Sequence, residues 1–212
     1  MKTANPLPAY ALTLDVEYPD RPLNRLTSAF RLVTLIPIAI VLAALGTLSA
    51  SGSSGDSGLI AAGGGLLVLP PLLMIVFRQK YPRWWFDLNR ELMRFTNRVH
   101  AYAALLNDRY PSTDEEQYVK LELEYPDVRE DLNRWLPLVK WLLAIPHYVV
   151  LFFLYLGALL AVVIAWFAIL FTGRYPRRLF DYVVGVMRWS NRVAAYAFVL
   201  ATDEYPPFRL AH

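Results

Sequence analysis

The sequence predicts an all-α membrane protein made of two tandem repeats, each with a two-span helical hairpin and an interfacial amphipathic helix, and with a small β-strand pair on the cytoplasmic side. Three observations predict this fold class: the chain repeats itself, each copy contains two apolar runs, and basic residues avoid both predicted hairpin tips. The composition agrees with it, because 56% of the residues are hydrophobic and only 18% are charged, which is typical of the membrane class.

The internal repeat covers most of the chain. Tyr18-Pro19 of the first copy returns as Tyr125-Pro126, and Asn97-Arg98-Val99 returns as Asn191-Arg192-Val193. Other matched segments are Leu23-Asn24-Arg25 with Leu132-Asn133-Arg134, Ile36-Pro37 with Ile145-Pro146, Tyr81-Pro82 with Tyr175-Pro176, and Phe86-Asp87 with Phe180-Asp181. The repeat predicts two units, residues 1–110 and 111–212, each with a strand, two spans and a surface helix.

Two apolar runs of the first copy predict a helical hairpin. They are Leu32 to Ala50 and Leu59 to Phe77, and a polar turn rich in glycine and serine, residues 51–58, joins them. The second run carries no charge. As a helix it would be about 28 Å long at about 1.5 Å per residue, which matches the hydrocarbon core of a bilayer.

The second copy contains one long apolar run, Trp141 to Phe171, interrupted only by His147. This run is too long for one upright span. Two short spans with a break near Leu156-Gly157 and a single tilted helix are both compatible with it. The alignment with the first copy, which has its glycine- and serine-rich turn at the corresponding place, favours two spans.

The basic residues predict the orientation of the hairpins. None lies in residues 50–58 or near Gly157, whereas they are frequent in the N-terminal segment, in the middle segment Arg78 to Lys140 and after Gly173. By the positive-inside rule, both hairpin tips would face outward, with the N-terminus and the C-terminus in the cytoplasm. Met1 to Asp20 lacks the features of a signal peptide, so we expect the spans themselves to direct the chain to the membrane.

Two segments alternate between apolar and polar residues, which is typical of β-strands. The first runs from Leu12 to Tyr18 and the second from Val119 to Tyr125. Because two strands alone are marginally stable in water, they would pair with each other, lie against the surface helices or pair with a partner. The repeat favours the first of these arrangements.

Arg83 to Leu106 and Arg177 to Leu200 have the periodicity of amphipathic helices. Such a helix would lie flat at the interface with its aromatic rings buried; packing of its apolar face on the hairpins is the alternative, and the two are compatible. Six arginines occur at matched positions, four on these helices and one ahead of the first apolar run of each copy. For each pair we favour helix capping and ordinary snorkelling at a membrane edge, and the repetition supports a collective contact with anionic lipid headgroups as the alternative. The six arginines are Arg25, Arg94, Arg98, Arg134, Arg188 and Arg192.

His147 is the one ionisable residue well inside an apolar run, and such a residue is a functional candidate by default. It could bind a quinone or relay a proton. A haem held by two histidines of this chain is excluded, since His100 lies on a surface helix and His212 ends the chain. The first copy has Ile38 at the corresponding position. The interpretation that we favour is a neutral histidine that forms a hydrogen bond to a neighbouring helix or to the carbonyl freed by Pro146.

The sequence contains no motif for catalysis, metal binding or cofactor binding. It has no cysteine, which excludes disulfides, thiolate metal sites and cysteine nucleophiles. Gly63-Gly64-Gly65 lies inside an apolar run and lacks the lysine and hydroxyl of a phosphate-binding loop. A serine–histidine–acid set and a histidine pair with metal-ligand spacing are both absent. We therefore expect neither enzymatic activity nor a cofactor.

The recurring pattern of Tyr-Pro, Leu-Asn-Arg, Ile-Pro-His, Arg-Tyr-Pro, Phe-Asp, Asn-Arg-Val and Ala-Tyr resembles a bacterial membrane family, the domain-of-unknown-function family 4389. The resemblance extends from Leu12 to Pro206 and is most specific between Leu121 and Tyr205. It implies a unit of two membrane spans and a surface helix, often in tandem, and it implies no activity. The first copy departs from the pattern at Ile36-Pro37-Ile38, which lacks the histidine.

Together these observations predict a non-catalytic, multi-pass protein of the bacterial inner membrane. We expect it to contact anionic lipid and to be an accessory or scaffold subunit of a larger membrane complex or a homo-oligomer. A small oligomeric transporter or channel is the alternative, and a quinone- or proton-handling subunit that uses His147 is a second alternative. No nucleic-acid partner is expected.

Overall fold

The computed structural model describes residues 10–31, 33–38, 40, 65–112 and 117–211. The strands are β1 (Leu12–Val16) and β2 (Val119–Leu123), and the helices are α1 (Arg25–Ala29), α4 (Gly65–Leu73), α5 (Arg83–Ala103), α6 (Pro137–Leu143), α7 (Ile145–Thr172) and α8 (Arg177–Ala194). Two short π-helical segments, η1 (Met74–Arg78) and η2 (Ala195–Val199), continue α4 and α8.

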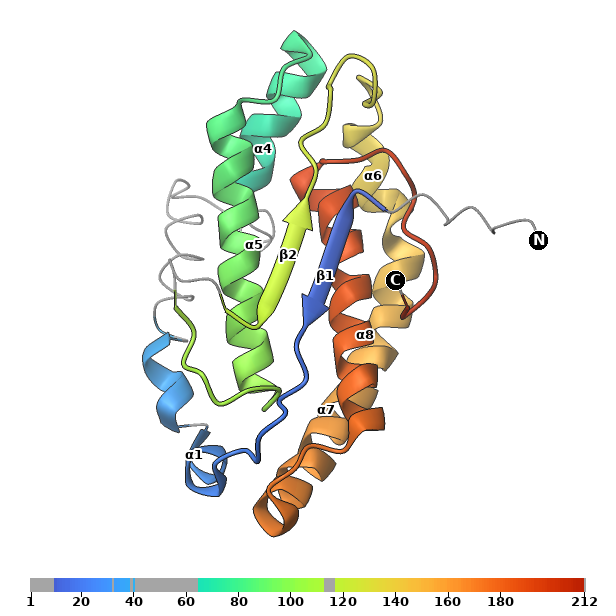
Figure 1. Cartoon of the computed structure of the whole chain (residues 1–212). Coiled ribbons are helices and arrows are strands. Elements are labelled where there is room, and N and C mark those ends of the chain that lie inside the picture. The colour runs from blue at the N-terminus through green and yellow to red at the C-terminus, as the bar shows by residue number, and fades with distance from the viewer. Residues whose placement is uncertain (1–9, 32, 39, 41–64, 113–116, 212) are drawn as a thin grey trace, which may run out of the picture.

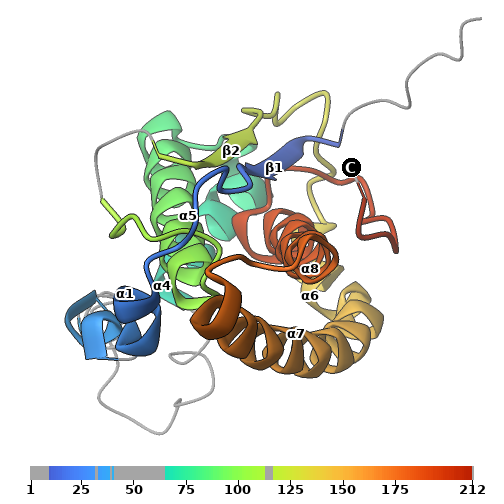
Figure 2. The same ribbon diagram turned by 60° about the horizontal axis from the view of Figure 1, so that its bottom comes forward.

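The elements are arranged in layers. The two strands lie on one side, α5 and α8 form the layer behind them, and α7 lies on the far side of α8 from the strands (Figure 1, Figure 2). The short helix α1 packs beside α7, where the indole N–H of Trp166 donates a hydrogen bond to the carbonyl of Ser28 at 3.0 Å. The strands and α7 are therefore separated by the thickness of one helix.

The two predicted strands pair with each other, which confirms that prediction. They are antiparallel, with Leu14 opposite Leu121. Side chains in both strands alternate between buried and exposed, because one face of the sheet packs on helices and the other does not. Each strand packs on the helix of the other half of the chain, β1 on α8 and β2 on α5.

The two predicted amphipathic helices are confirmed as helices, but α8 does not lie at the surface of the molecule. It packs against β1 on one side and against α7 on the other. Phe180 and Trp189 are both buried, as are Val183, Val184 and Val186. The apolar residues of α8 therefore pack on protein, which is the alternative named above for this helix.

The predicted break near Leu156-Gly157 is wrong, because Ile145–Thr172 form one uninterrupted helix of 28 residues. A Cβ atom at Gly157 would lie 2.5 Å from the hydroxyl oxygen of Tyr182 on α8. The glycine therefore permits a close approach of α8 and does not make a turn. The helix is interrupted earlier, at Ala144, because Pro146 lacks an N–H and lies in the first turn of α7.

The predicted fold class of two tandem two-span hairpins is wrong, because the second predicted hairpin is the single helix α7. Within the described residues, one helix, α7, is long and apolar enough to cross a membrane, and Leu67–Arg78 form a shorter apolar helix. The first predicted hairpin, Leu32 to Ala50 with Leu59 to Phe77, lies largely outside the described residues. The multi-pass orientation required a hairpin tip at Gly157, and a continuous helix has no such tip.

Candidate functional site

Helix α7 exposes large apolar side chains along its length. Only 22% of its most apolar stretch is buried, whereas the core helix of a water-soluble protein would be mostly buried. Three of the six buried residues of α7 are alanines, Ala158, Ala161 and Ala165. The exposed positions include Phe152, Phe153, Leu156, Leu159, Leu160, Val163, Ile164, Phe167 and Phe171.

The exposed apolar surface continues on α6, which precedes α7 in the chain. Helix α6 exposes Leu138, Trp141 and Leu142. None of the exposed residues of α6 and α7 is charged, because Lys140 is the one charged residue in these helices and it is buried. We call the exposed apolar side chains of α6 and α7 the apolar face.

The structure gives most of the predicted lipid-binding arginines partners within the chain. Arg94 and Arg188 occupy matched positions of the repeat, and their Nε atoms donate to the carbonyl oxygens of Leu121 at 2.9 Å and of Leu14 at 2.8 Å. Arg188 also forms an ion pair with Asp15 at 3.0 Å. These two arginines therefore fasten each strand to the helix on which it packs.

Arg98 and Arg192 are also a matched pair, and both are buried. Arg98 donates to the carbonyl of Ser112 at 2.9 Å, and Arg192 donates to the carbonyl of Arg209. Burial lowers the pKa of Arg192 below its usual value, and the neighbouring charge of Arg209 lowers it further. The burial of these two side chains leaves no surface for a lipid headgroup.

Arg25 and Arg134 differ from the other four because they are exposed. The Nε of Arg134 donates to the carbonyl of Val76 at 2.5 Å. Each of these arginines precedes an exposed apolar residue, Leu26 or Trp135. Lipid contact stays a prediction for this pair.

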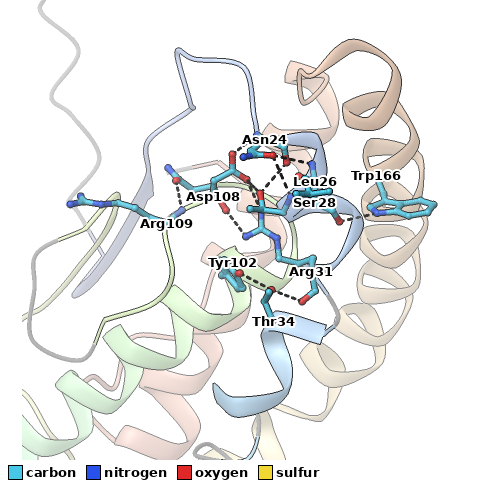
Figure 3. A network of polar contacts seen from close by, with 11 residues as sticks. Asn24, Leu26, Ser28, Arg31, Thr34, Tyr102, Asp108, Arg109 and Trp166 are labelled. Atoms are coloured by element: carbon cyan, nitrogen blue, oxygen red, sulfur yellow. Dashed lines mark hydrogen bonds and ion pairs between the residues drawn. The ribbon is translucent and has the colours of Figure 1, made fainter.

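A buried ion pair holds the start of the first half together (Figure 3). Nη2 of Arg31 lies 2.7 Å from Oδ1 of Asp108, and its guanidinium lies 4.0 Å from the ring centre of Tyr102. The other carboxylate oxygen of Asp108 accepts from the backbone N–H of Asn24 at 2.6 Å. The network therefore links the segment around α1 to the turn that follows α5.

The second half repeats this arrangement with a lysine. Lys140 takes the place of Arg31, and its Nζ lies 2.6 Å from Oδ1 of Asp203 and 5.2 Å from the ring centre of Tyr196. The Lys140 side chain is completely buried. Burial lowers the pKa of Lys140, and the hydrogen bond and charge of Asp203 act in the opposite direction.

His147 lies in the first turn of α7, and its side chain is completely buried. Its Nδ1 accepts a hydrogen bond from Nε1 of Trp189 at 3.0 Å, which confirms the predicted bond to a neighbouring helix. The ring stacks on Phe208, with 4.1 Å between the centroids. Nε2 must carry the proton of the neutral ring, and it has no hydrogen-bond partner in the described part of the chain.

The corresponding place in the first half is apolar. Ile38 is buried against Phe95 and Val99, and Phe95 matches Trp189 in the repeat. A histidine–tryptophan hydrogen bond in one half thus replaces an isoleucine–phenylalanine contact in the other. The first pair joins the segment after α1 to α5, and the second joins α7 to α8.

Two open cavities flank a polar centre between α5 and α8. The side-chain amides of Asn97 and Asn191 exchange two hydrogen bonds of 2.7 Å. One cavity, of about 480 Å³, lies between α5, α7 and α8, and the other, of about 310 Å³, lies between α4, α5 and α8. His100 and Ser190 line both. The described residues contain no group of three or more His, Cys, Asp or Glu side chains that could hold a metal ion.

The sequence reasoning missed the two buried ion pairs and the asparagine pair. Arg31 and Lys140 occupy the same place in the two copies, at the edge of an apolar run, and this match was the available signal. Asn97 and Asn191 were visible as repeated Asn-Arg dipeptides. That the two copies contact each other through these amides required the tertiary structure.

Comparison with known proteins supports the family resemblance over the second half. Residues 135–209 match the model of the family described as Domain of unknown function (DUF4389). The matched region begins just before α6, contains α7 and α8, and ends in the segment that stacks on His147. No curated protein and no solved structure is significantly similar to the chain.

Proposed function

We propose that the chain is a non-catalytic membrane protein that contacts lipid through the apolar face and serves as an accessory or scaffold subunit of a membrane complex. The observation that carries this proposal is the exposure of α7. The nine exposed side chains named above are each about half exposed or more. Transfer of nine such side chains from water to lipid would contribute on the order of 10 kcal/mol.

Anionic lipid is the preferred partner of the exposed arginines. Arg25 and Arg134 each lie beside an exposed apolar residue, as expected for groups at the level of the headgroups. Each basic residue near an anionic leaflet contributes about 1 kcal/mol. The other four arginines are excluded from this part of the proposal because they are buried or partly buried and bond to carbonyl oxygens of the chain.

Vesicle flotation tests the membrane proposal. The chain, reconstituted from mild detergent, should float with neutral phosphatidylcholine vesicles, and Phe152→Glu combined with Phe167→Glu should reduce the floating fraction at least tenfold. Thr13→Glu places one such charge on the exposed face of β1 and should change nothing, whereas Phe152→Glu alone should already reduce flotation. Equal flotation of the double variant and of the control variant would disprove lipid contact through α7.

Addition of anionic phosphatidylglycerol to the vesicles tests the arginines. Arg25→Gln combined with Arg134→Gln should remove most of the gain in binding that the anionic lipid gives, and should leave binding to neutral vesicles unchanged.

The subunit role requires a separate measurement. Affinity purification in mild detergent should recover a second protein in a fixed ratio, whereas a pure homo-oligomer would refute the accessory role and favour the transporter alternative.

A further inference from the structure

A helix of 28 apolar residues can either cross a bilayer or lie along its surface. At about 1.5 Å per residue α7 is about 42 Å long, which exceeds a hydrocarbon core of about 30 Å. Length and composition therefore do not distinguish the two orientations. The parts of the fold that lie beside α7 do distinguish them.

The sheet lies at the same level as the first half of α7. The hydroxyl of Tyr155 on α7 donates to Oγ of Ser190 on α8 at 2.6 Å. Two residues earlier on α8, Arg188 donates to the carbonyl of Leu14 on β1. A short lateral path through one helix thus joins α7 to β1, which runs beside α8, with β2 next to it beside α5 (Figure 1).

The side of the sheet that faces away from α8 is charged. Asp15 is 60% exposed, and the ion pair between Lys120 and Glu17 is 64% and 57% exposed at its two members. Glu122 is exposed on the same face of β2. If α7 stood upright in the bilayer, these charges would lie at the depth of the hydrocarbon, where charged groups are strongly disfavoured.

The edges of the sheet exclude the upright orientation on independent grounds. Among the described residues the sheet has two strands, so each strand pairs on one side and presents an outer edge, at which Arg188 and Arg94 occupy the carbonyls of Leu14 and Leu121 and the remaining groups need water. Lipid-exposed open edges do not occur within the hydrocarbon, because their N–H and C=O groups would have no partner. A sheet at this place must therefore be in water.

We propose that α7 lies in the plane of the membrane, with the apolar face in one leaflet and the sheet in the aqueous phase on the same side. In this orientation α7 does not cross the membrane, and α8 is the boundary layer between lipid and the water-exposed strands (Figure 2). The inference rests on the proposed lipid contact and adds its geometry. It places both ends of α7 on one side of the membrane.

Depth measurements along α7 test this orientation. The chain has no cysteine, so Phe152→Cys, Leu160→Cys and Phe167→Cys each accept a single spin label at an exposed position. Collision with oxygen and with a water-soluble nickel complex in reconstituted vesicles gives the depth of each label. All three labels should lie at about the same depth, about 5–10 Å below the headgroup boundary.

An upright α7 would give a different profile. The labels at Phe152 and Phe167 would lie about 22 Å apart along the membrane normal and near opposite headgroup boundaries, and the label at Leu160 would lie near the bilayer centre, about 10 Å deeper than both. A deeper label at Leu160 would overturn the in-plane orientation while leaving lipid contact intact. A label at Thr13→Cys on the sheet should be accessible to the water-soluble nickel complex. Its burial in lipid would also overturn the proposal.

Two further outcomes separate this inference from the proposed function. If none of the three α7 labels responds to oxygen as a lipid-exposed label does, lipid contact itself is refuted and the orientation with it. If those labels also show dipolar broadening between chains, a second copy of the chain covers the apolar face. Flotation of the labelled variants confirms that each protein under measurement is bound to the vesicles.

Discussion

The hydrogen bond between His147 and Trp189 has an apolar counterpart in the same chain, and this permits a double-mutant cycle. His147→Ile and Trp189→Phe together install the pair that the first half already uses, Ile38 with Phe95. Each single substitution removes one partner of the hydrogen bond. The double substitution removes both partners of the hydrogen bond and leaves an apolar contact like the one that Ile38 and Phe95 make in the first half.

The magnitudes follow from the burial of the pair. His147 is 0% exposed and Trp189 is 6% exposed, so His147→Ile leaves the indole N–H buried without an acceptor. That costs about 1–3 kcal/mol. Trp189→Phe removes the donor to Nδ1 in a ring whose Nε2 already has no partner among the described residues, and we expect a similar loss. The double variant should recover at least about 1 kcal/mol relative to the sum of the two single losses.

Thermal unfolding in mild detergent, followed by circular dichroism, measures these differences. A loss of about 1 kcal/mol lowers Tm by about 2–4 °C in a chain of this length. His147→Gln should be nearly silent, because the Gln carbonyl can accept from the indole N–H in place of Nδ1. Ile38→Val is the matched control and should cost about 0.5–1.5 kcal/mol. Strict additivity of the two single losses would refute a structural role for the hydrogen bond.

Three other substitutions test packing and buried charge in the same assay. Arg31→Met should destabilise the chain by about 3–5 kcal/mol because it leaves the Asp108 carboxylate without its buried partner, and Arg31→Met with Asp108→Asn should recover part of this loss. Asn97→Leu should cost about 1–3 kcal/mol, since the facing amide on α8 loses its partner; no loss would mean that water replaces it. Gly157→Ala should cost about 1–3 kcal/mol through overpacking against the Tyr182 hydroxyl, and Tyr182→Phe should relieve it. A Gly157→Ala protein as stable as the unmodified chain would contradict the close approach.

Local patterns in the sequence were sufficient for the strands and for the helices behind them. The alternation of Leu12 to Tyr18 and of Val119 to Tyr125 predicted both strands, and the repeat predicted that they pair. These features could be predicted because a period of two residues, or of 3.6, is a property of the backbone conformation itself. The repeat likewise identified Arg94 and Arg188 as equivalent residues before their matched contacts were known.

The roles of the same residues depended on neighbours that are distant in the chain. Gly157 is compatible with a turn or with close packing, and the hydroxyl of Tyr182 decided for close packing. Arg98 and Arg192 resemble snorkelling residues in sequence, yet the segments after α5 and after η2 cover them.

The sequence by itself determined where the two strands and the helices α5 and α8 form and which positions correspond between the halves, because these depend on local periodicity and on repetition. Only the tertiary structure decided that α7 is one helix, that α8 lies behind the strands and that most of the predicted arginines bond to the chain itself. The physical reason is that a helix with the same periodic apolar stripe can bury that stripe in lipid or against another part of the protein. The partner is fixed only when another element occupies that face.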